Sequence, residues 1–271
     1  MRGACPEVCG SMEIRLFGHA DVSSSGVPIK FAKRSTTLAM IAYLVLRRGQ
    51  SISRESLAFV LFPESDETAA LAELRRYLYL AAKALPERAG EPWIVADSET
   101  VRWNERDDAF VDVLAFERLA ADPETHLAAI ELYAGDLLED VYDDWVLGER
   151  ERLRARYLTI LTASIERRRA RRAFGPAIEL ATRLLASDPW REDALRSLVA
   201  IRYESGDTAG ALAEYDRFAK RLRDDLGIAP MAETVAVRRS ILRNEAVPGS
   251  LDRALGTIAA TAAPARAVLP F

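Results

Sequence analysis

The spacing of hydrophobic residues changes along the chain near residue 110. Before that point, Glu13–Phe17 and Val27–Phe31 are short runs of the kind that forms β-strands. The polar stretch Asp21–Gly26 between them predicts a turn. After residue 111 the apolar residues recur at the spacing of amphipathic helices. We therefore expect a mixed α and β region followed by an all-helical one.

Three helices and a β-hairpin are expected after the two strands. The first helix is expected at Ser35–Arg47, and the second at Arg54–Leu61 with Ser53 as its N-cap. The third is expected to begin after a cap at Ser65 or Asp66 and to end at Ala84 or Leu85. The hairpin strands are expected at Trp93–Asp97 and Val101–Asn104. Strands, three helices and a hairpin are the layout of a winged helix-turn-helix, in which the third helix enters the major groove of DNA.

Seven helical segments are expected in the second half. They are Asp112–Leu119, Ala128–Tyr133, Asp144–Arg169, Phe174–Ser187, Arg191–Glu204, Thr208–Leu226 and Met231–Asn244. Phe174–Ala181 aligns with Thr208–Tyr215 at a spacing of 34 residues, which is the period of tetratricopeptide helix pairs. The predicted fold class is therefore an α+β N-terminal winged helix-turn-helix followed by an all-α tetratricopeptide-like helical repeat domain.

A chain of 271 residues has the length of two domains. We expect a disordered leader at 1–12, a winged-helix DNA-binding domain at 13–110, a helical domain at 111–245 and a linker at 246–271. Because the 34-residue repeat draws on no residue of the first half, 112–245 is expected to fold alone as a helical unit.

Composition excludes several classes of protein. A content of 49% hydrophobic and 29% charged residues is typical of soluble globular chains, and no run of 18 apolar residues predicts a membrane span. Since the N-terminus lacks a secretory signal, we expect a cytoplasmic protein. Cys5 and Cys9 fit two incidental thiols in a leader. With only His19 and His126 as histidines and no phosphate-binding glycine loop, we expect no metal, no cofactor and no enzymatic activity.

The predicted third helix has two different faces. Its core face comprises Leu71, Leu74, Leu78, Ala81 and Leu85, at three- and four-residue spacing. Its predicted DNA-facing side comprises Arg75, Arg76, Tyr79 and Lys83. Arginine and lysine reach phosphates and guanine edges, and tyrosine contacts a phosphate or a thymine methyl group. A solvated helix face is the alternative explanation of the same pattern.

Other candidate DNA contacts lie outside this helix. Arg54, at the start of the second helix, is expected to hold a phosphate, and Ser98, Thr100 and Arg102 are expected to serve the hairpin wing. The formal net charge of −4 argues neither for nor against DNA. However, Val22–Arg54 carries six cationic residues and no acidic one, which is compatible with a basic surface.

Several motifs of the chain are similar to those of a known family. They are Leu57-Ala58 with Leu61-Phe62-Pro63, Leu74-Arg75, Val111-Asp112-Val113 with Phe116-Glu117, Leu132–Leu138, Asp144-Trp145-Val146, Glu149–Arg154, Leu185–Pro189 and Leu226–Pro230. In this order and spacing, the chain resembles the Streptomyces antibiotic regulatory protein family over about residues 13–245.

The resemblance implies a transcriptional activator. It would combine an OmpR-type winged helix with a bacterial transcriptional activation domain, bind double-stranded DNA at direct repeats as a homodimer, and help to recruit RNA polymerase. Many larger members of the family continue into a P-loop ATPase after a linker similar to Ala267–Phe271. The reading frame is therefore expected to continue past Phe271 into a Walker-type loop.

The chain departs from the family pattern in the predicted third helix. Glu73 stands where asparagine is common, and Ala81-Ala82 where Leu-Arg is common. A carboxylate facing phosphate weakens DNA binding, and the missing arginine removes a contact. A second hypothesis therefore stays open: a signalling scaffold whose winged helix has lost DNA readout and whose repeat groove binds a protein or ligand.

Two further sets of residues favour structural roles. Trp145 and Tyr133 are expected to pack between helices rather than to contact a ligand. The arginine-rich stretch 167–172 is expected to be a solvated helix end, with an extended DNA footprint or an acidic partner as the alternative.

Overall fold

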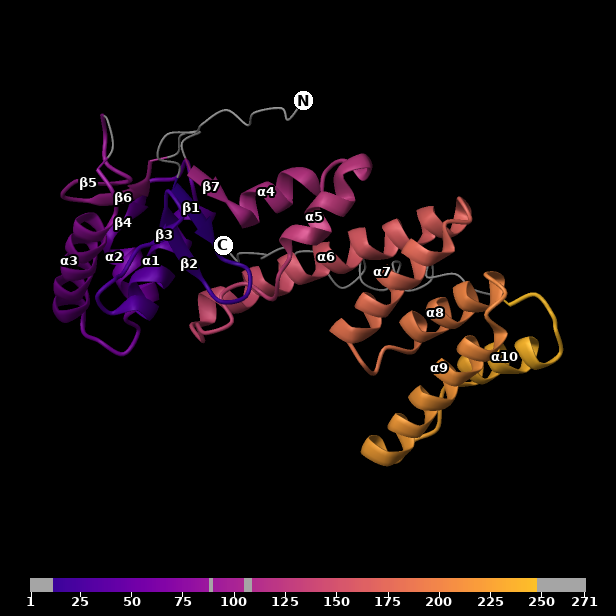
Figure 1. Cartoon of the computed structure of the whole chain (residues 1–271). Helices are drawn as coiled ribbons and strands as arrows, with labels where there is room; N and C mark the ends of the chain where they lie inside the picture. Colours follow the sequence, from indigo (N-terminus) through magenta and orange to yellow (C-terminus); the bar gives the residue numbers. More distant parts are fainter. Residues whose placement is uncertain (1–11, 88–89, 105–108, 248–271) are drawn as a thin grey trace, which may run out of the picture. The chain divides into compact units, whose positions relative to one another are not determined.

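The computed structural model describes residues 12–87, 90–104 and 109–247 (Figure 1). The chain divides into two compact units between Tyr157 and Leu158, within helix α6 (Asp144–Ala170). The predicted order of a small sheet, three helices, a hairpin and then helices is confirmed. Among the described residues, no helix is long and apolar enough to cross a membrane.

A four-stranded sheet opens the first unit. Its strand order is β3-β2-β1-β7, with β3 (Val27–Pro28), β2 (Asp21–Ser24), β1 (Met12–Arg15) and β7 (Ala109–Val111). Strands β1 and β2 are antiparallel, whereas β1 and β7 are parallel. Ile14 and Val22 are paired in register and buried. This sheet brings residue 110 beside the first strand of the chain.

The predicted turn at Asp21–Gly26 is wrong in part, because Asp21–Ser24 form β2. The strand pairs on both sides, and this satisfies the backbone of serines that have little strand propensity of their own. The turn is confined to Ser25 and Gly26, which have φ angles of 51° and 76°. Strand β3 ends at Pro28, which has no N–H for the ladder, so the predicted strand Val27–Phe31 is too long.

Three helices and a second sheet follow. They are α1 (Arg34–Leu46), β4 (Ile52–Ser53), α2 (Arg54–Leu61), α3 (Glu67–Ala84), β5 (Ile94–Ala96) and β6 (Thr100–Trp103). The second sheet has the order β4-β6-β5. The caps Ser53 and Asp66 are confirmed, since their side chains accept the N–H of Ser56 and Ala69 at 3.1 and 2.9 Å.

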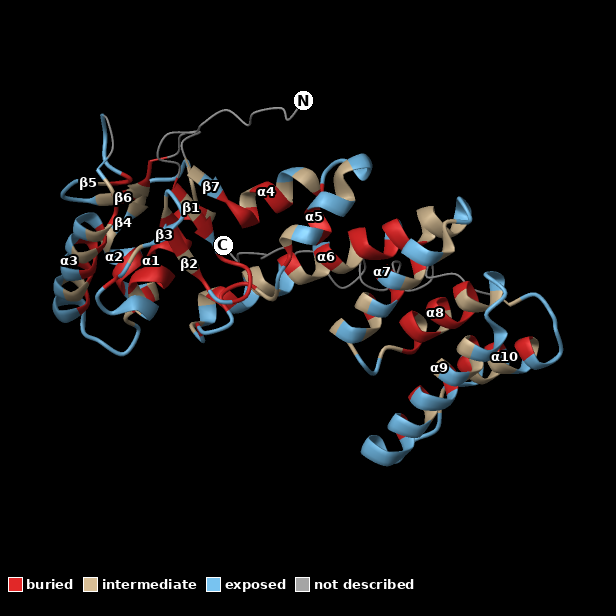
Figure 2. Ribbon diagram, viewed as in Figure 1, coloured by how far each residue is buried: buried red, intermediate tan, exposed pale blue. Residues whose placement is uncertain are grey.

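Helix α3 buries one side and exposes the other (Figure 2). Its buried residues are Ala70, Leu74, Tyr77, Leu78 and Ala81. The prediction that Leu71 belongs to the core face is wrong, because Leu71 is half-buried at the edge. Tyr77 is buried instead and packs on Phe62, with ring centroids 5.5 Å apart. The other four predicted core residues, Leu74, Leu78, Ala81 and Leu85, are buried, so the prediction is confirmed for them.

Helices α4 (Asp112–Leu119), α5 (His126–Leu132) and the first half of α6 complete the first unit. Buried Asp112 ties α4 to the end of β1, because its carboxylate accepts the N–H groups of Leu16 and Phe17 at 2.9–3.0 Å. Burial raises the pKa of this carboxyl group, and the N–H donors oppose that shift.

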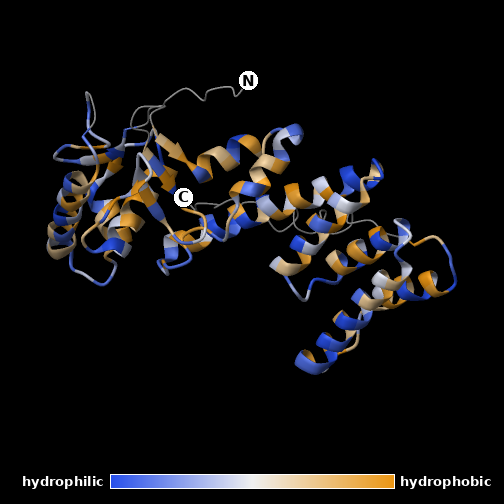
Figure 3. Cartoon of the chain, in the orientation of Figure 1, coloured by the Kyte–Doolittle hydropathy of each residue, from blue (hydrophilic) through white to orange (hydrophobic). Residues whose placement is uncertain are grey.

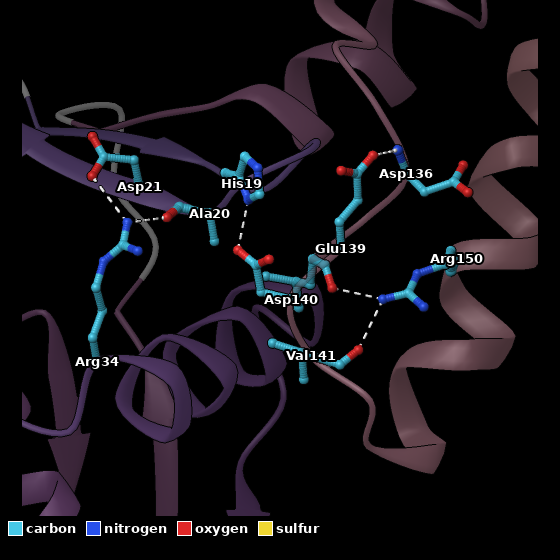
Figure 4. A network of polar contacts seen from close by, with 10 residues as sticks. His19, Ala20, Asp21, Arg34, Asp136, Glu139, Asp140, Val141 and Arg150 are labelled. Carbon is cyan, nitrogen blue, oxygen red and sulfur yellow. Dashed lines mark hydrogen bonds and ion pairs between the residues drawn. The ribbon is translucent and has the colours of Figure 1, made fainter.

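The segment before α6 packs on the same strand. Phe17 forms a bridge with Leu137, and the N–H of Leu138 donates to the Leu16 carbonyl at 2.8 Å. Figure 4 shows this region, in which Arg150 donates to the carbonyls of Leu138 and Val141 at 2.6 and 2.9 Å. Helix α4 and the segment before α6 therefore contact Leu16 and Phe17, whereas the 34-residue repeat takes no part in these contacts. The independent folding expected of 112–245 would have to occur without them.

The described part of the second unit, residues 158–247, holds the end of α6 and four further α-helices. They are α7 (Phe174–Ser187), α8 (Glu192–Glu204), α9 (Thr208–Arg221) and α10 (Ala232–Leu242), with the π-helical turn η2 (Leu222–Leu226) before α10. Apolar and polar residues alternate around these helices (Figure 3). Ala177 and Ala211, equivalent in the 34-residue alignment, are both fully buried. The core of the second unit includes Leu195, Val199, Tyr215, Phe218 and Ile241.

Candidate nucleic-acid interface

Arg54 lies where α2 meets the hairpin. Strand β4 pairs with β6, so that Ser53 lies opposite Thr100. The Arg54 N–H donates to the Glu99 carbonyl at 2.9 Å, and its guanidinium Nη1 donates to the Asp97 carbonyl at 2.7 Å. Arg54 therefore holds the β5–β6 turn against α2. Its Nη1 group already donates a hydrogen bond to the protein backbone.

The β5–β6 turn is organised by Asp97, which is not among the predicted site residues. Its carboxylate accepts the N–H groups of Glu99 and Thr100 at 2.8 and 2.7 Å, and the Thr100 hydroxyl at 2.9 Å. These hydrogen bonds lower the pKa of Asp97. The sequence signal was an aspartate opening the turn Asp97–Thr100, which is typical of an Asx-turn. The Thr100 hydroxyl thus shapes the turn.

The exposed side of α3 carries the four predicted DNA-facing residues. Arg75, Arg76, Tyr79 and Lys83 are all exposed, Tyr79 by 64%. Arg76 Nη1 lies 3.5 Å from Glu73 Oε1, one turn earlier, so the unusual carboxylate stands beside this arginine. Among the described residues, no ion pair joins Arg75 or Lys83 to a carboxylate. Within the described part of the chain, Arg75 and Lys83 are thus the two cations of this face that form no ion pair.

A hollow of about 460 Å³ brings together Arg54, Arg75 and Ser98. Leu71 lies at its wall, which accounts for its partial exposure. The carboxylates of Glu55 and Glu99 also line the hollow. Three predicted site residues from α2, α3 and the hairpin thus meet in one place, together with two acids that the sequence analysis did not single out.

The other predicted residues do not join this hollow. Arg76, Tyr79 and Lys83 lie on the outer side of α3. Arg102 is half-buried on β6 and pairs with Glu91 at 3.2 Å. The geometry gives Arg102 a partner within the protein, which nothing in the local sequence indicated.

Several cations of the basic stretch Val22–Arg54 have contacts within the protein. Arg34 donates to the Ala20 carbonyl at 2.6 Å and lies 3.6 Å from Asp21 (Figure 4). Arg47 stacks on the Tyr43 ring, with 3.7 Å between its guanidinium carbon and the ring centroid. With Arg54, which donates to the Asp97 carbonyl, at least three of the six cations take part in structural contacts.

The two aromatic residues singled out in the sequence have the packing roles expected of them. Trp145 packs edge-on against Tyr43 at 5.0 Å between ring centroids, and Tyr133 stacks on Tyr157 at 4.1 Å. In the arginine-rich stretch, Arg169 pairs with Glu204 and Glu166. At least this arginine belongs to an ion-pair network of the second unit.

Comparisons with known proteins agree with this architecture. The family model described as "Bacterial transcriptional activator domain" matches residues 108–242. The transcriptional regulator RedD of Streptomyces coelicolor is 30% identical over 243 residues, which cover 82% of this chain and 68% of RedD. The regulatory protein DnrI of Streptomyces peucetius is 27% identical over 263 residues, which cover 89% of this chain and 95% of DnrI.

Two larger proteins share part of their length with this chain. The regulatory protein AfsR of Streptomyces griseus is 26% identical over 243 residues, and the match spans 85% of this chain but only 24% of AfsR. A solved structure of Mycobacterium tuberculosis EmbR, in complex with a low-affinity phosphopeptide, superposes with a TM-score of 0.66 at 23% identity. That match covers 93% of this chain and 70% of the EmbR chain, and it shows a shared fold.

The relatives are regulatory proteins, and RedD is matched over more than two thirds of its length at 30% identity. The motifs from Val111 to Pro230 that first indicated the family lie within the region that the family model matches. This chain therefore belongs to the Streptomyces antibiotic regulatory protein family of bacterial transcriptional regulators.

Proposed function

We propose that this protein is a DNA-binding transcriptional activator in which α2, α3 and the β5–β6 hairpin act as a winged helix-turn-helix. Helix α3 would enter the major groove with its exposed side toward the bases. The observation that carries the proposal is the pair Arg75 and Lys83, exposed on α3 without a carboxylate partner among the described residues.

The spacing of these two cations fits a groove. Eight residues of α-helix separate them, a rise of about 12 Å, close to the ~12 Å width of the major groove. Arg75 also lines the hollow that contains Arg54 and Ser98. A phosphate in that hollow would receive hydrogen bonds from both arginines and the serine hydroxyl, while Glu55 and Glu99 would limit its affinity.

The remaining predicted residues take supporting roles in this proposal. Tyr79 and Arg76 would contact the backbone or base edges from the outer side of α3. Thr100 holds the wing turn through Asp97, and Arg102 holds β6 through Glu91. Both would therefore position the wing for backbone contact.

The proposed division of labour assigns residues 13–110 to DNA binding and 111–245 to the activation domain, with tetratricopeptide-like helix pairs. Dimeric binding to direct repeats and contact with RNA polymerase are proposed from the family alone. The chain corresponds to about a quarter of the AfsR proteins, so the proposal concerns only the region that it contains.

The test begins with selection of duplex DNA bound by the purified chain from a random library. Fluorescence anisotropy over a series of salt concentrations then compares Arg75→Ala and Lys83→Ala with the parent. Each should weaken binding by about 1–3 kcal/mol if it contacts a base, or lower the salt slope by about one unit if it contacts a phosphate. Arg118→Ala, which removes an exposed arginine of α4, is the matched control.

A second candidate function is favoured by the acids around this face. Glu73 beside Arg76, together with Glu55 and Glu99 in the hollow, would oppose phosphate binding. The protein would then be a scaffold whose helical unit binds a partner. Absence of DNA binding by the parent at low salt, or equal binding by both alanine variants and the parent, would contradict DNA readout by α3 and favour the scaffold.

A further inference from the structure

A groove runs between helices α9 and α10 in the second unit. Its volume is about 680 Å³, and Arg223 of the η2 turn and Pro230 also line it. The apolar part of its lining is formed by Tyr215, Ala219, Val235 and Leu242. Leu242 is 58% exposed although it is a large aliphatic side chain at the end of α10. The groove therefore offers apolar surface that no described residue covers.

The rim of the same groove is strongly cationic. Lys220 and Arg223 come from the α9 side, Arg238 and Arg239 from α10, and Asp216 is the single carboxylate. Asp216 pairs with Arg238 at 3.3 Å. Among the described residues, no ion pair joins Lys220, Arg223 or Arg239 to an acid. Three cations thus remain available to a ligand around an apolar floor.

Exposed aliphatic residues also lie on the η2–α10 connection, which contributes Pro230 to the groove. Leu226, Ile228 and Met231 are exposed by 49%, 52% and 61%. The connection starts with a π-helical turn that ends at Gly227, whose φ angle of 68° suits glycine. Scattered exposed aliphatic residues are ordinary, but neighbouring ones beside an apolar groove indicate a contact surface.

We infer that this groove binds an acidic amphipathic helix of a partner protein. A helix laid between α9 and α10 would place apolar side chains on the floor formed by Tyr215, Val235 and Leu242, as in other helix-in-groove complexes. Carboxylates flanking its apolar side would face Lys220, Arg223 and Arg239. The apolar floor favours a peptide over nucleic acid, because phosphate contacts require no buried aliphatic surface.

The groove belongs to the second unit, whereas all residues of the proposed DNA interface belong to the first unit. Asp224 and Asp225 in the η2 turn are exposed but do not line the groove. The net charge of the lining is therefore positive, which predicts that acidic peptides bind more tightly at low salt. The inference does not depend on whether α3 binds DNA.

The test uses the full chain and a labelled helical peptide of about 16 residues, roughly 24 Å long. The peptide has leucine at positions i, i+3, i+4 and i+7 and glutamate at most others, and a second peptide has lysine in place of glutamate. Fluorescence anisotropy compares the parent with Lys220→Glu/Arg239→Glu and with Leu242→Ser. Arg171→Glu/Arg172→Glu is the charge-matched control, since both arginines are exposed in the second unit and outside the groove.

The acidic peptide should bind the parent and the control alike. The double charge reversal should weaken it by about tenfold or more and should instead favour the lysine peptide, while Leu242→Ser should weaken both pairings. This exchange of preference distinguishes loss of the groove charge from loss of folding. The inference would be overturned if the parent does not bind the acidic peptide, or if the double variant binds it as tightly as the parent does. So would loss of duplex DNA binding in the groove variants, which would assign the groove to nucleic acid.

Discussion

Glu73 and Arg76 illustrate how one side chain alters what its neighbour can contact. At 3.5 Å, the carboxylate partly neutralises the guanidinium that the helix would present to DNA. Both side chains are substantially exposed, so the pair adds little to folding stability. Its main consequence is electrostatic, at the surface proposed to meet phosphate.

Replacement of Glu73 by glutamine should therefore tighten DNA binding. The change removes a negative charge and releases Arg76, and the expected gain is up to about 1 kcal/mol, roughly fivefold in affinity. The measurement is an anisotropy titration with the selected DNA, and Glu64→Gln, which neutralises an exposed acid before α3, is the control. Equal affinity of Glu73→Gln and the parent would show that this side of α3 does not approach phosphate.

His19 forms a second exposed contact with a defined pH dependence. Its Nδ1 lies 2.7 Å from Asp140 Oδ2, and this hydrogen bond raises the pKa of the imidazole (Figure 4). Because the folded pKa is raised, the interaction is complete below the unfolded pKa and is lost as pH rises through the folded value. An NMR titration of the chain, which has two histidines, should show the His19 midpoint falling in Asp140→Asn. An unmoved midpoint would contradict the contact.

At the scale of elements, the β5–β6 turn depends on one carboxylate. Asp97→Ala removes the acceptor of two N–H groups and the Thr100 hydroxyl, whereas Asp97→Asn keeps one oxygen for the N–H groups. We expect faster amide exchange at Glu99 and Thr100 in the alanine variant and intermediate exchange in the asparagine variant. DNA affinity should fall in the same order. Parent-like exchange in Asp97→Ala would show that the β4–β6 pairing alone holds the turn.

The helices were largely predictable from sequence, and their tertiary attachments were not. Apolar spacing placed most helix ends within about three residues, and Ser53 and Asp66 were recognisable caps. Strand β2 was missed because its serines signal a turn, and only pairing on both sides makes it a strand. Among site residues, Arg75 and Lys83 followed from helical periodicity. The Arg102–Glu91 pair and the contacts of Arg54 depend on folding of the hairpin, which no local pattern specifies.

At the scale of the whole molecule, the structure changes where the protein can be divided. Phe17 packs on Phe116 and Tyr133, at 5.3 and 4.7 Å between ring centroids, and Asp112 receives its N–H donors from the first strand segment. A fragment that starts at residue 112 loses these partners. In such a fragment, the rings of Phe116 and Tyr133 are exposed where Phe17 covers them in the whole chain. The Asp112 carboxylate also lacks the N–H donors of Leu16 and Phe17.

We therefore predict that 12–157 is more stable as a fragment than 12–110, and that 112–245 loses helicity in α4 and α5 relative to the whole chain. Circular dichroism and amide exchange measure both effects. Phe17→Ala in the whole chain is a milder version of the truncation and should destabilise the first unit by about 3–5 kcal/mol. Full protection of α4 and α5 in the 112–245 fragment would contradict the prediction.

The continuity of α6 across the division has a consequence for degradation. Leu153 and Tyr157 on one side of the division, and Ile160 and Leu161 on the other, are all buried within a single hydrogen-bonded helix. Proteases cleave extended, exposed segments and act poorly on the interior of a packed helix. A protease that acts on the native chain would thus find no cleavage site at the junction, so the two units would be turned over together and remain present in equal amounts.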